Sequence, residues 1–342
     1  MAEDRIWKPG AVTPPAGNNI RLFALNGTEE LGRRISDLVG CPLGRHEERD
    51  FEDGEHKARP LDPVGGAEVY VIHSLHGGPD QSANDKLCRL LFFIAALKDA
   101  GAAQVTAVAP YLCYSRKDRR TKTNDPVTTR YVAALFEAVG CDVMVTLEVH
   151  NEAAFENAFR RRAVALTVAP LLIDALQSFV GSEPLCIVSP DLGGGKRADL
   201  LRGGLERALG RPVGTAFAEK HRSAGVVSGE LFVGNVAGAT CIIVDDLVST
   251  GGTLVRAARA ARSRGAGCIL ACVAHGLFMP GAETALADPC IDRILVTDVV
   301  PPFRLPAGAV RDKVVIVPAA PLLAEAIRRL HAGAPLADLM VF

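Results

Sequence analysis

Aromatic residues are scarce in this chain of 342 residues, which has one Trp and four Tyr. This scarcity argues against a surface on which successive nucleic-acid bases could stack. The formal net charge is −1, from 38 basic and 39 acidic residues. No global charge therefore favours a nucleic acid or an anionic membrane surface as a partner. We expect a protein that binds neither.

The pattern of cysteines and the lack of long apolar runs exclude further classes. The nine cysteines contain no CxxC pair, and most lie inside apolar runs, as Cys186, Cys241 and Cys272 do. Buried, reduced thiols therefore fit better than a disulfide framework or a zinc site. No apolar run approaches membrane-spanning length, and the first ten residues carry no secretory signal pattern. These features predict a soluble, cytoplasmic protein.

Strand and helix patterns alternate along the chain, whose length suggests two domains. Each apolar, β-branched run leads through a polar loop into a helical pattern, which is typical of parallel sheets with right-handed crossovers. The two halves have the same outline and resemble a degenerate internal duplication. The predicted strands are residues 20–24, 69–72, 105–109 and 143–149 in the first half, and 185–188, 213–218, 241–244, 269–275 and 294–296 in the second.

The most informative stretch is residues 241–254, which read CIIVDDLVSTGGTL. A buried-type strand is followed by two carboxylates, Asp245 and Asp246, and by a turn rich in Ser, Thr and Gly before a helix. Such a loop binds anions, because backbone N–H groups and the helix N-terminus face the ligand. The carboxylates would repel a bare phosphate, so they need ribose hydroxyls or a metal as partners. A sugar-phosphate site is the prediction; the alternative is an acidic turn at a strand end.

Three polar segments of the first half are not decisive when taken alone. FEDGE, residues 51–55, is a turn-like acidic segment with one aromatic, and alone it indicates a solvated turn. Residues 116–122 hold five basic side chains after a strand end, where a parallel sheet presents its ligands. Phosphate binding and a solvated loop are equally open there. His150 directly follows a predicted strand and is either a functional or a structural histidine.

Other candidates are weaker when taken alone. His73 and His76 are spaced like a metal-binding pair, but no third ligand lies nearby in sequence, so a metal site is not favoured. Asp191 follows a strand and precedes three glycines that form a turn into a helix. Residues 219–222, EKHR, form a second basic cluster.

In order along the chain, these segments resemble those of the ribose-phosphate pyrophosphokinase (PRPP synthetase) family. FEDGE resembles its nucleotide-contacting segment, PYLCYSRKDRR its basic ATP segment, and LEVHNEAAF the segment with the catalytic histidine. SPDLGGGKRA resembles its Asp-Gly-Gly turn, AEKHR its catalytic flexible loop, and CIIVDDLVSTGGTL its PRPP-binding loop. SANDKLCRLLFFIAALKDAGA and the tail VTDVVPP…LLAEAIRRL also match. The resemblance covers about residues 20–342 and indicates a divergent member.

The resemblance implies an α/β fold of two tandem type I phosphoribosyltransferase-like domains, each a mainly parallel sheet flanked by helices. Residues 19–165 would form the domain with the ATP segments, and residues 166–342 the domain with the PRPP loop. Residues 1–18 would be an N-terminal arm, and the last helix, about 321–331, would pack back on the N-terminal domain.

The implied reaction transfers the β,γ-diphosphoryl group of ATP to the 1-hydroxyl of ribose 5-phosphate, giving PRPP and AMP, with Mg²⁺ as cofactor. Such a displacement depends on positioning and charge stabilisation. The family implies a homo-oligomer, a dimer or hexamer, with the nucleotide site shared between subunits. The implied roles are ribose 5-phosphate binding by Asp245, Asp246, Ser249, Thr250, Gly251, Gly252 and Thr253; ATP binding by Phe51, Asp53, Glu55, Arg116, Lys117 and Asp118; metal binding by His150 and Asp191; and catalysis by Lys220, Arg222 and His150.

Departures from the family pattern leave some properties open. Lys117 stands where the family has Gln, and Ser249 where Asp is common, so donor and acceptor preferences are not fixed. Two other functions also stay open: a regulatory subunit associated with PRPP synthetase, and a type I phosphoribosyltransferase that consumes PRPP. The retained catalytic candidates favour an active enzyme. The ATP segment and the duplicated architecture favour synthesis over consumption.

Overall fold

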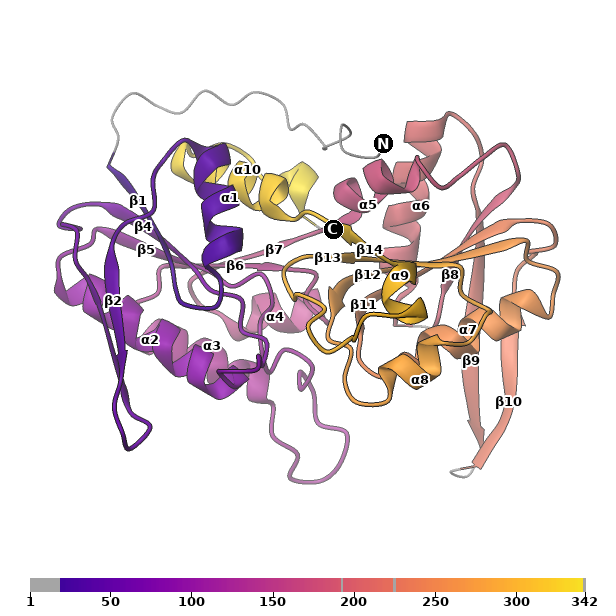
Figure 1. Cartoon of the computed structure of the whole chain (residues 1–342), viewed down its shortest axis with the longest axis horizontal. Helices are drawn as coiled ribbons and strands as arrows, with labels where there is room; N and C mark the ends of the chain where they lie inside the picture. Colours follow the sequence, from indigo (N-terminus) through magenta and orange to yellow (C-terminus); the bar gives the residue numbers. More distant parts are fainter. Residues whose placement is uncertain (1–18, 192, 224–225, 341–342) are drawn as a thin grey trace. The chain divides into compact units, whose positions relative to one another are not determined.

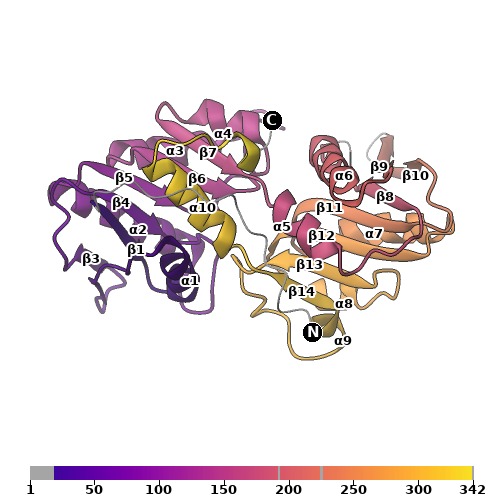
Figure 2. The ribbon, with the colours of Figure 1, turned by 90° about the horizontal axis from the view of Figure 1, so that it is seen from above.

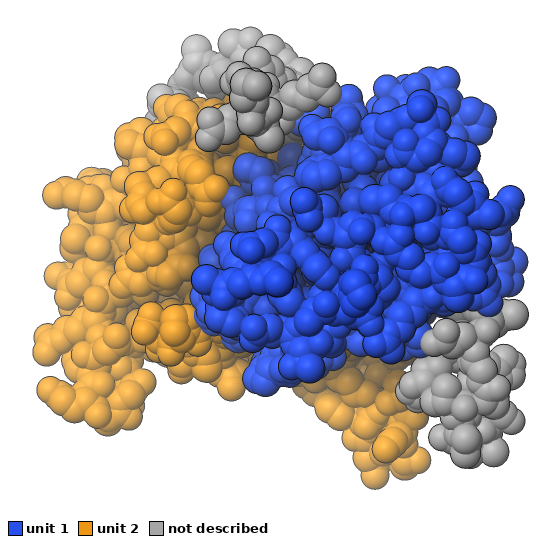
Figure 3. Space-filling view, turned by 45° about the vertical axis from the view of Figure 1, so that its right-hand side comes forward, with its two compact units in different colours: residues 1–7, 168–319 blue, residues 8–167, 320–342 orange. Residues whose placement is uncertain are grey.

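A computed structural model describes residues 19–191, 193–223 and 226–340, without the side chains of residues 219–231. The described chain forms two compact units, shown in different colours in Figure 3. The N-terminal unit comprises residues 19–167 and 320–340, and the C-terminal unit comprises residues 168–319. The predicted α/β class, with mainly parallel sheets flanked by helices, is confirmed. The predicted arm, residues 1–18, lies outside the described residues.

The N-terminal unit is built on a five-stranded parallel sheet in the order β1-β4-β5-β6-β7 (Figure 1). Its strands read as nearly continuous apolar runs because both faces of the sheet are covered. A separate antiparallel hairpin, β2 and β3, lies between α1 and β4 in the chain. The strands are β1 (Ile20–Ala24), β2 (His46–Asp50), β3 (His56–Pro60), β4 (Glu68–Ile72), β5 (Gln104–Val108), β6 (Val143–Leu147) and β7 (Arg162–Leu166). The helices are α1 (Glu29–Val39), α2 (Ala83–Asp99), α3 (Thr128–Ala138) and α4 (Glu152–Ala158).

The last helix, α10 (Ala320–His331), packs beside α1 in the N-terminal unit (Figure 2). Arg328 donates a hydrogen bond to the Leu38 carbonyl, and His331 Nδ1 lies 2.8 Å from a Glu68 oxygen. A short 3₁₀ helix, η1 (Ala337–Leu339), then leads to an isolated bridge between Met340 and β7. The end of the chain is thus part of the N-terminal unit.

The C-terminal unit is built on a seven-stranded sheet in the order β10-β9-β8-β11-β12-β13-β14. Every neighbouring pair is parallel except β9 with β10, which form an antiparallel hairpin. The strands are β8 (Leu185–Ser189), β9 (Gly214–Ser223), β10 (Val226–Val233), β11 (Thr240–Val248), β12 (Cys268–Gly276), β13 (Arg293–Thr297) and β14 (Val314–Val317). The helices are α5 (Ala169–Leu176), α6 (Gly195–Leu209), α7 (Gly252–Arg262), α8 (Ala282–Leu286) and α9 (Ala309–Lys313).

Both units have one element order: strand, helix, hairpin, and then four strands separated by helices. The series that starts at β1 in the N-terminal unit corresponds to the series that starts at β8 in the C-terminal unit. β4 therefore corresponds to β11, and α2 to α7. The duplication inferred from the outline of the sequence is visible in the topology. The hairpins differ, since β9 joins its main sheet whereas β2 and β3 pair only with each other.

Several local predictions are wrong. The arginines at 160–162 and the later Pro170 predict a junction over residues 160–170, but this stretch contains β7. The second basic cluster lies within β9 rather than in a loop. The strand predicted to end at Val244 continues to Val248. The position of Thr28 just before a helical pattern predicts an N-cap for α1, but Thr28 makes no side-chain cap there. Its hydroxyl instead contacts His73 Nδ1 at 3.0 Å and accepts from the Ser74 amide.

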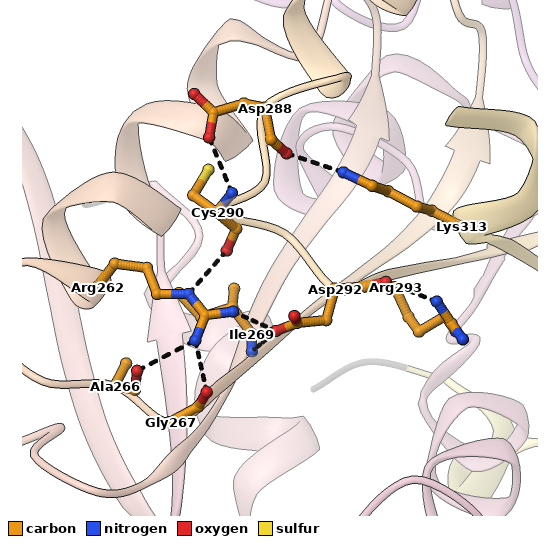
Figure 4. A network of polar contacts seen from close by, with 9 residues as sticks. All are labelled: Arg262, Ala266, Gly267, Ile269, Asp288, Cys290, Asp292, Arg293 and Lys313. Carbon is orange, nitrogen blue, oxygen red and sulfur yellow. Dashed lines mark hydrogen bonds and ion pairs between the residues drawn. The ribbon is translucent and has the colours of Figure 1, made fainter. Parts of the chain in front are cut away.

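A network of polar contacts fixes the carboxyl end of α7 (Figure 4). Arg262 pairs with Asp292, which also accepts the Ile269 amide at 2.7 Å. The Arg262 guanidinium donates to the backbone carbonyls of Ala266, Gly267 and Cys290 as well. One arginine therefore ties α7 to the residues just before β12 and β13, at the opposite end of the helix from Gly252.

None of the helices in the described ranges has the length and apolar character that crossing a membrane requires.

Candidate functional site

The two adjacent carboxylates lie within β11, near its carboxyl end, and differ in exposure. The side chain of Asp245 is 19% exposed, whereas Asp246 is buried. The Asp246 amide donates to Asp245 Oδ1 at 2.9 Å. Asp245 is thus the carboxylate that a ligand reaches more easily.

Burial and the proximity of Asp246 raise the pKa of Asp245 to about 7. Burial is the larger cause, because removal of water disfavours the charged form of the carboxyl group. The neighbouring carboxylate adds like-charge repulsion, which acts in the same direction. Arg197 opposes both effects, and its Nη1 lies 4.0 Å from Asp245 Oδ1. Buried, closely spaced acids of this kind are typical of functional sites.

The turn after β11 leads directly into α7. Gly251 has φ +81°, and a Cβ at this position would lie 2.7 Å from Leu286 Cδ2, so the turn requires glycine. Ser249 is anchored by its carbonyl, which accepts from the Met279 amide at 2.9 Å. Gly251 is the N-cap residue of α7 and no side chain caps the helix. The first amides of α7 therefore offer an anion-binding end.

The corresponding helix of the N-terminal unit is closed by its own side chains. Ser82 caps α2 by accepting from the Asp85 amide, and Asp85 accepts from the Ser82 amide in return. This capping box satisfies backbone donors and places a carboxylate at the positive end of the helix. Of the two corresponding positions, only the one at α7 has its helix N-terminus uncapped by a side chain.

Asp191 organises the turn between β8 and α6. Its Oδ1 accepts from the Gly194 amide at 2.9 Å, and its carbonyl accepts from the Ser189 hydroxyl at 2.6 Å. The turn sets the start of α6 and with it Arg197, in the first turn of that helix. Asp191 is exposed. Asp191 and Asp245 thus lie near the carboxyl ends of the neighbouring strands β8 and β11, and Arg197 lies in the helix that follows β8.

In the N-terminal unit, a hydrogen bond joins the basic segment to the segment of His150. Asn151 Nδ2 donates to Asp118 Oδ2 at 2.6 Å, and Asn151 Oδ1 accepts from the Ala154 amide as the N-cap of α4. His150 itself is exposed, beyond the end of β6. Two segments predicted separately therefore meet at the carboxyl edge of this sheet. Sequence reasoning did not identify Asn151 as the link.

The ammonium group of Lys117 is engaged within its own loop. It pairs with Asp125 at 2.7 Å, and Asp125 also accepts from the Thr121 hydroxyl and from two backbone amides. These donors hold the pKa of Asp125 well below its usual range, with the Lys117 contact as the largest cause. Lys117 therefore closes the loop from 117 to 125.

Phe51, Asp53 and Glu55 lie in the turn of the β2–β3 hairpin and are exposed. Asp53 Oδ1 accepts from the Glu55 amide at 3.0 Å, and the Arg49 guanidinium lies 5.2 Å from the centre of the Phe51 ring. Both contacts join residues of the hairpin itself.

His73 and His76, which are spaced like a metal-binding pair, are both buried. His73 is fully buried against Thr28, and burial lowers its pKa well below the usual value. No group of three or more metal-ligating side chains occurs in the described part of the chain. The side chains of Lys220 and Arg222 lie outside the described residues; their backbone belongs to β9.

Comparison with known proteins identifies the family. A family model for the N-terminal domain of ribose phosphate pyrophosphokinase matches residues 20–140, and one for a phosphoribosyl synthetase-associated domain matches residues 228–341. The chain is 33% identical to ribose-phosphate pyrophosphokinase 1 of Streptococcus agalactiae, over 94% of this chain and 97% of that protein. It is 35% identical to the enzyme of Haemophilus ducreyi, over 91% and 96%.

A solved structure agrees with these relatives. The phosphoribosylpyrophosphate synthetase of Mycobacterium smegmatis aligns with a TM-score of 0.82 and 29% identity, over 93% of this chain and 100% of that one. Together with the uncapped start of α7 after β11, the relatives and the shared fold define a diphosphotransferase. The chain belongs to the ribose-phosphate pyrophosphokinase family.

Proposed function

We propose that this protein transfers the β,γ-diphosphoryl group of ATP to the 1-hydroxyl of ribose 5-phosphate, releasing AMP and PRPP. The observation that carries the assignment of the acceptor is the turn after β11, where the uncapped start of α7 follows Asp245 and Asp246. In a member of this family, a carboxylate pair beside an anion-binding helix N-terminus suits a sugar phosphate, because the carboxylates can accept the sugar hydroxyls and the helix amides can bind the phosphate.

The 5-phosphate binds the turn and the first residues of α7, with Asp245 and Asp246 accepting hydrogen bonds from the ribose hydroxyls. A hydroxyl donates to an ionised carboxylate, and such charge-assisted bonds are shorter and stronger than neutral ones. The partial exposure of Asp245 supports its direct contact with the sugar, and the backbone amide of buried Asp246 donates a hydrogen bond to Asp245 Oδ1. The phosphate-binding residues are Ser249, Thr250, Gly251, Gly252 and Thr253.

The donor nucleotide binds through the N-terminal unit. Arg116 and Asp118 contact ATP, and the Asn151–Asp118 hydrogen bond keeps their segment beside His150. Lys117 contributes to ATP binding by closing its loop through Asp125. Phe51, Asp53 and Glu55 recognise the adenosine part from the exposed hairpin turn, in an oligomer where a subunit contact completes the site. A dimer or hexamer is the proposed assembly.

Mg²⁺ suits this site on the chemistry of the donors. Mg²⁺ binds proteins through one or two carboxylates and leaves its other positions to phosphates and water. Asp191 is an exposed carboxylate at a strand end and fits that description. The imidazole of His150 is a less usual magnesium ligand, so we assign it to the metal or to the phosphates directly. Bound Mg²⁺ would neutralise charge on the transferred diphosphoryl group.

Lys220 and Arg222 are the proposed catalytic cations. Charge builds on the oxygens of the transferred group during displacement, and positioned cations stabilise it where it develops. Their assignment is supported by the resemblance of AEKHR to the family's catalytic loop.

Identification of the nucleotide product tests the function. The protein is incubated with Mg²⁺, ATP and ribose 5-phosphate, and the products are separated by ion exchange. AMP with PRPP is the expected pair, whereas ADP would rule out diphosphoryl transfer. Absence of turnover, with ribose 5-phosphate still bound, would indicate a regulatory subunit. The relatives above are all pyrophosphokinases over nearly the whole chain, which does not favour a PRPP-consuming transferase.

A further inference from the structure

We propose that Arg197 is a positioning residue of the acceptor site, which favours the ionised form of Asp245 and so its capacity to accept the ribose hydroxyls. The inference rests on the proposed function and deepens it. Arg197 belongs to the same segment as Asp191 but has no assigned ligand of its own, and it acts through Asp245 rather than by touching the sugar.

The geometry fixes Arg197 beside Asp245 from a different element. Asp245 lies on β11, whereas Arg197 lies in the first turn of α6, and the two atoms Nη1 and Oδ1 are 4.0 Å apart. The side chain of Arg197 is only 16% exposed, so water does little to screen the pair. The Asp191 turn, held by the Gly194 and Ser189 hydrogen bonds, determines where α6 begins.

A cation beside Asp245 and Asp246 offsets effects that otherwise favour protonation of the Asp245 carboxylate. Two neighbouring carboxylates, one buried and one largely so, repel each other and lose hydration, and both effects favour the protonated form. The charged groups that act on Asp245 are Asp246 from its own strand and Arg197 from α6. A protonated carboxyl loses much of its capacity to accept hydroxyl hydrogen bonds. Arg197 shifts the balance toward the form that binds.

The separation of 4.0 Å also argues against a purely structural ion pair. It lies at the limit of a salt bridge and is longer than the hydrogen-bonded pairs that Arg202, on the same helix, makes with Asp199 and Glu206 at 2.7 Å. A contact of this length acts mainly through its field, which suits a group that must leave the oxygens of Asp245 open to a ligand.

The test compares Arg197→Met with wild type and with Arg202→Met, the matched control on α6. An opposite charge at this distance lowers a carboxyl pKa by about 1–3 units, so its loss raises that pKa by at least about one. The ionised fraction then falls about fivefold at pH 7 and hardly at all at pH 9. We therefore expect the KM for ribose 5-phosphate to rise about fivefold more at pH 7 than at pH 9, with the KM for ATP unchanged. Arg197→Lys should restore most of the affinity at pH 7.

A direct binding measurement separates this inference from the proposed function. Calorimetric titration with ribose 5-phosphate alone, in two buffers of different ionisation enthalpy, should show more protons released by Arg197→Met than by wild type at pH 7. An equal loss of affinity at pH 7 and pH 9 would assign Arg197 a structural role and overturn the inference. Wild type that binds no ribose 5-phosphate would overturn the proposed function itself. If Arg197→Met does not fold, Arg197→Gln takes its place in both measurements.

Discussion

Replacing Asp245 with Asn is expected to stabilise the ligand-free protein above neutral pH while it removes ribose 5-phosphate binding. The folded-state pKa of Asp245 is raised to about 7, from an ordinary value of 3.8. For a group whose pKa rises on folding, the associated stability is present at low pH and is lost as pH climbs toward the folded value. The ionised Asp245 carboxylate thus lowers the free energy of unfolding at pH 7 and above.

The magnitude follows from the size of the shift. About three pKa units correspond to roughly 4 kcal/mol at full ionisation, of which about 2–3 kcal/mol develops between pH 5 and pH 8. Asn can still accept the Asp246 amide, so the backbone contact is preserved.

Urea denaturation followed by circular dichroism at pH 5 and pH 8 provides the measurement. The advantage of Asp245→Asn over wild type should grow with pH, with the denaturant dependence unchanged. Asp199→Asn, which removes an exposed carboxylate from α6, is the control and should show no such growth. An advantage of Asp245→Asn that stays constant or shrinks between pH 5 and pH 8 would refute the burial argument.

Three other variants test separate parts of the account. Lys220→Ala should lower kcat far more than it weakens ribose 5-phosphate binding, as steady-state kinetics and a binding titration would show; unchanged turnover would remove Lys220 from catalysis. Gly251→Ala should destabilise the protein by about 1–2 kcal/mol in thermal melts, because φ is positive there and the added Cβ would press against Leu286. Gly252→Ala is the control and should cause no loss of stability, because the space around its Cβ is open. Arg262→Met should lower the free energy of unfolding by about 1–3 kcal/mol, because it removes several hydrogen bonds and an ion pair. The KM for ribose 5-phosphate should change little, because these contacts lie at the end of α7 away from the acceptor turn. A large rise in that KM would contradict this separation.

The buried strands were predictable because each appears in the sequence as a short, continuous apolar run. Ile20–Ala24 was predicted with its observed bounds, and the strands at 69–72 and 105–109 lie within a residue of β4 and β5. The β2–β3 hairpin was missed because its residues, HEERD and HKARP, are largely polar; the hairpin stands outside the main sheet, so no buried face imposes an apolar pattern. β7 was missed because a run of arginines precedes it.

The chemistry of the acceptor turn was also predictable, since adjacent carboxylates and a glycine turn are local in sequence. The difference in exposure between Asp245 and Asp246 was not, because it depends on the continuation of β11 and on its neighbours β8 and β12. Arg197 could not be assigned from sequence for a similar reason. It comes beside Asp245 only because β8 and β11 pair in the sheet, although the two residues lie 48 positions apart in the chain.

The most direct test of diphosphoryl transfer follows the β-phosphorus of ATP. ATP labelled with ³²P at the β-position is incubated with the protein, Mg²⁺ and ribose 5-phosphate, and the label is traced after separation. The account predicts that the label leaves the nucleotide and appears on the sugar product, while the nucleotide product is unlabelled AMP. Label that stays in the nucleotide, as ADP, while the sugar gains a single unlabelled phosphate would contradict it.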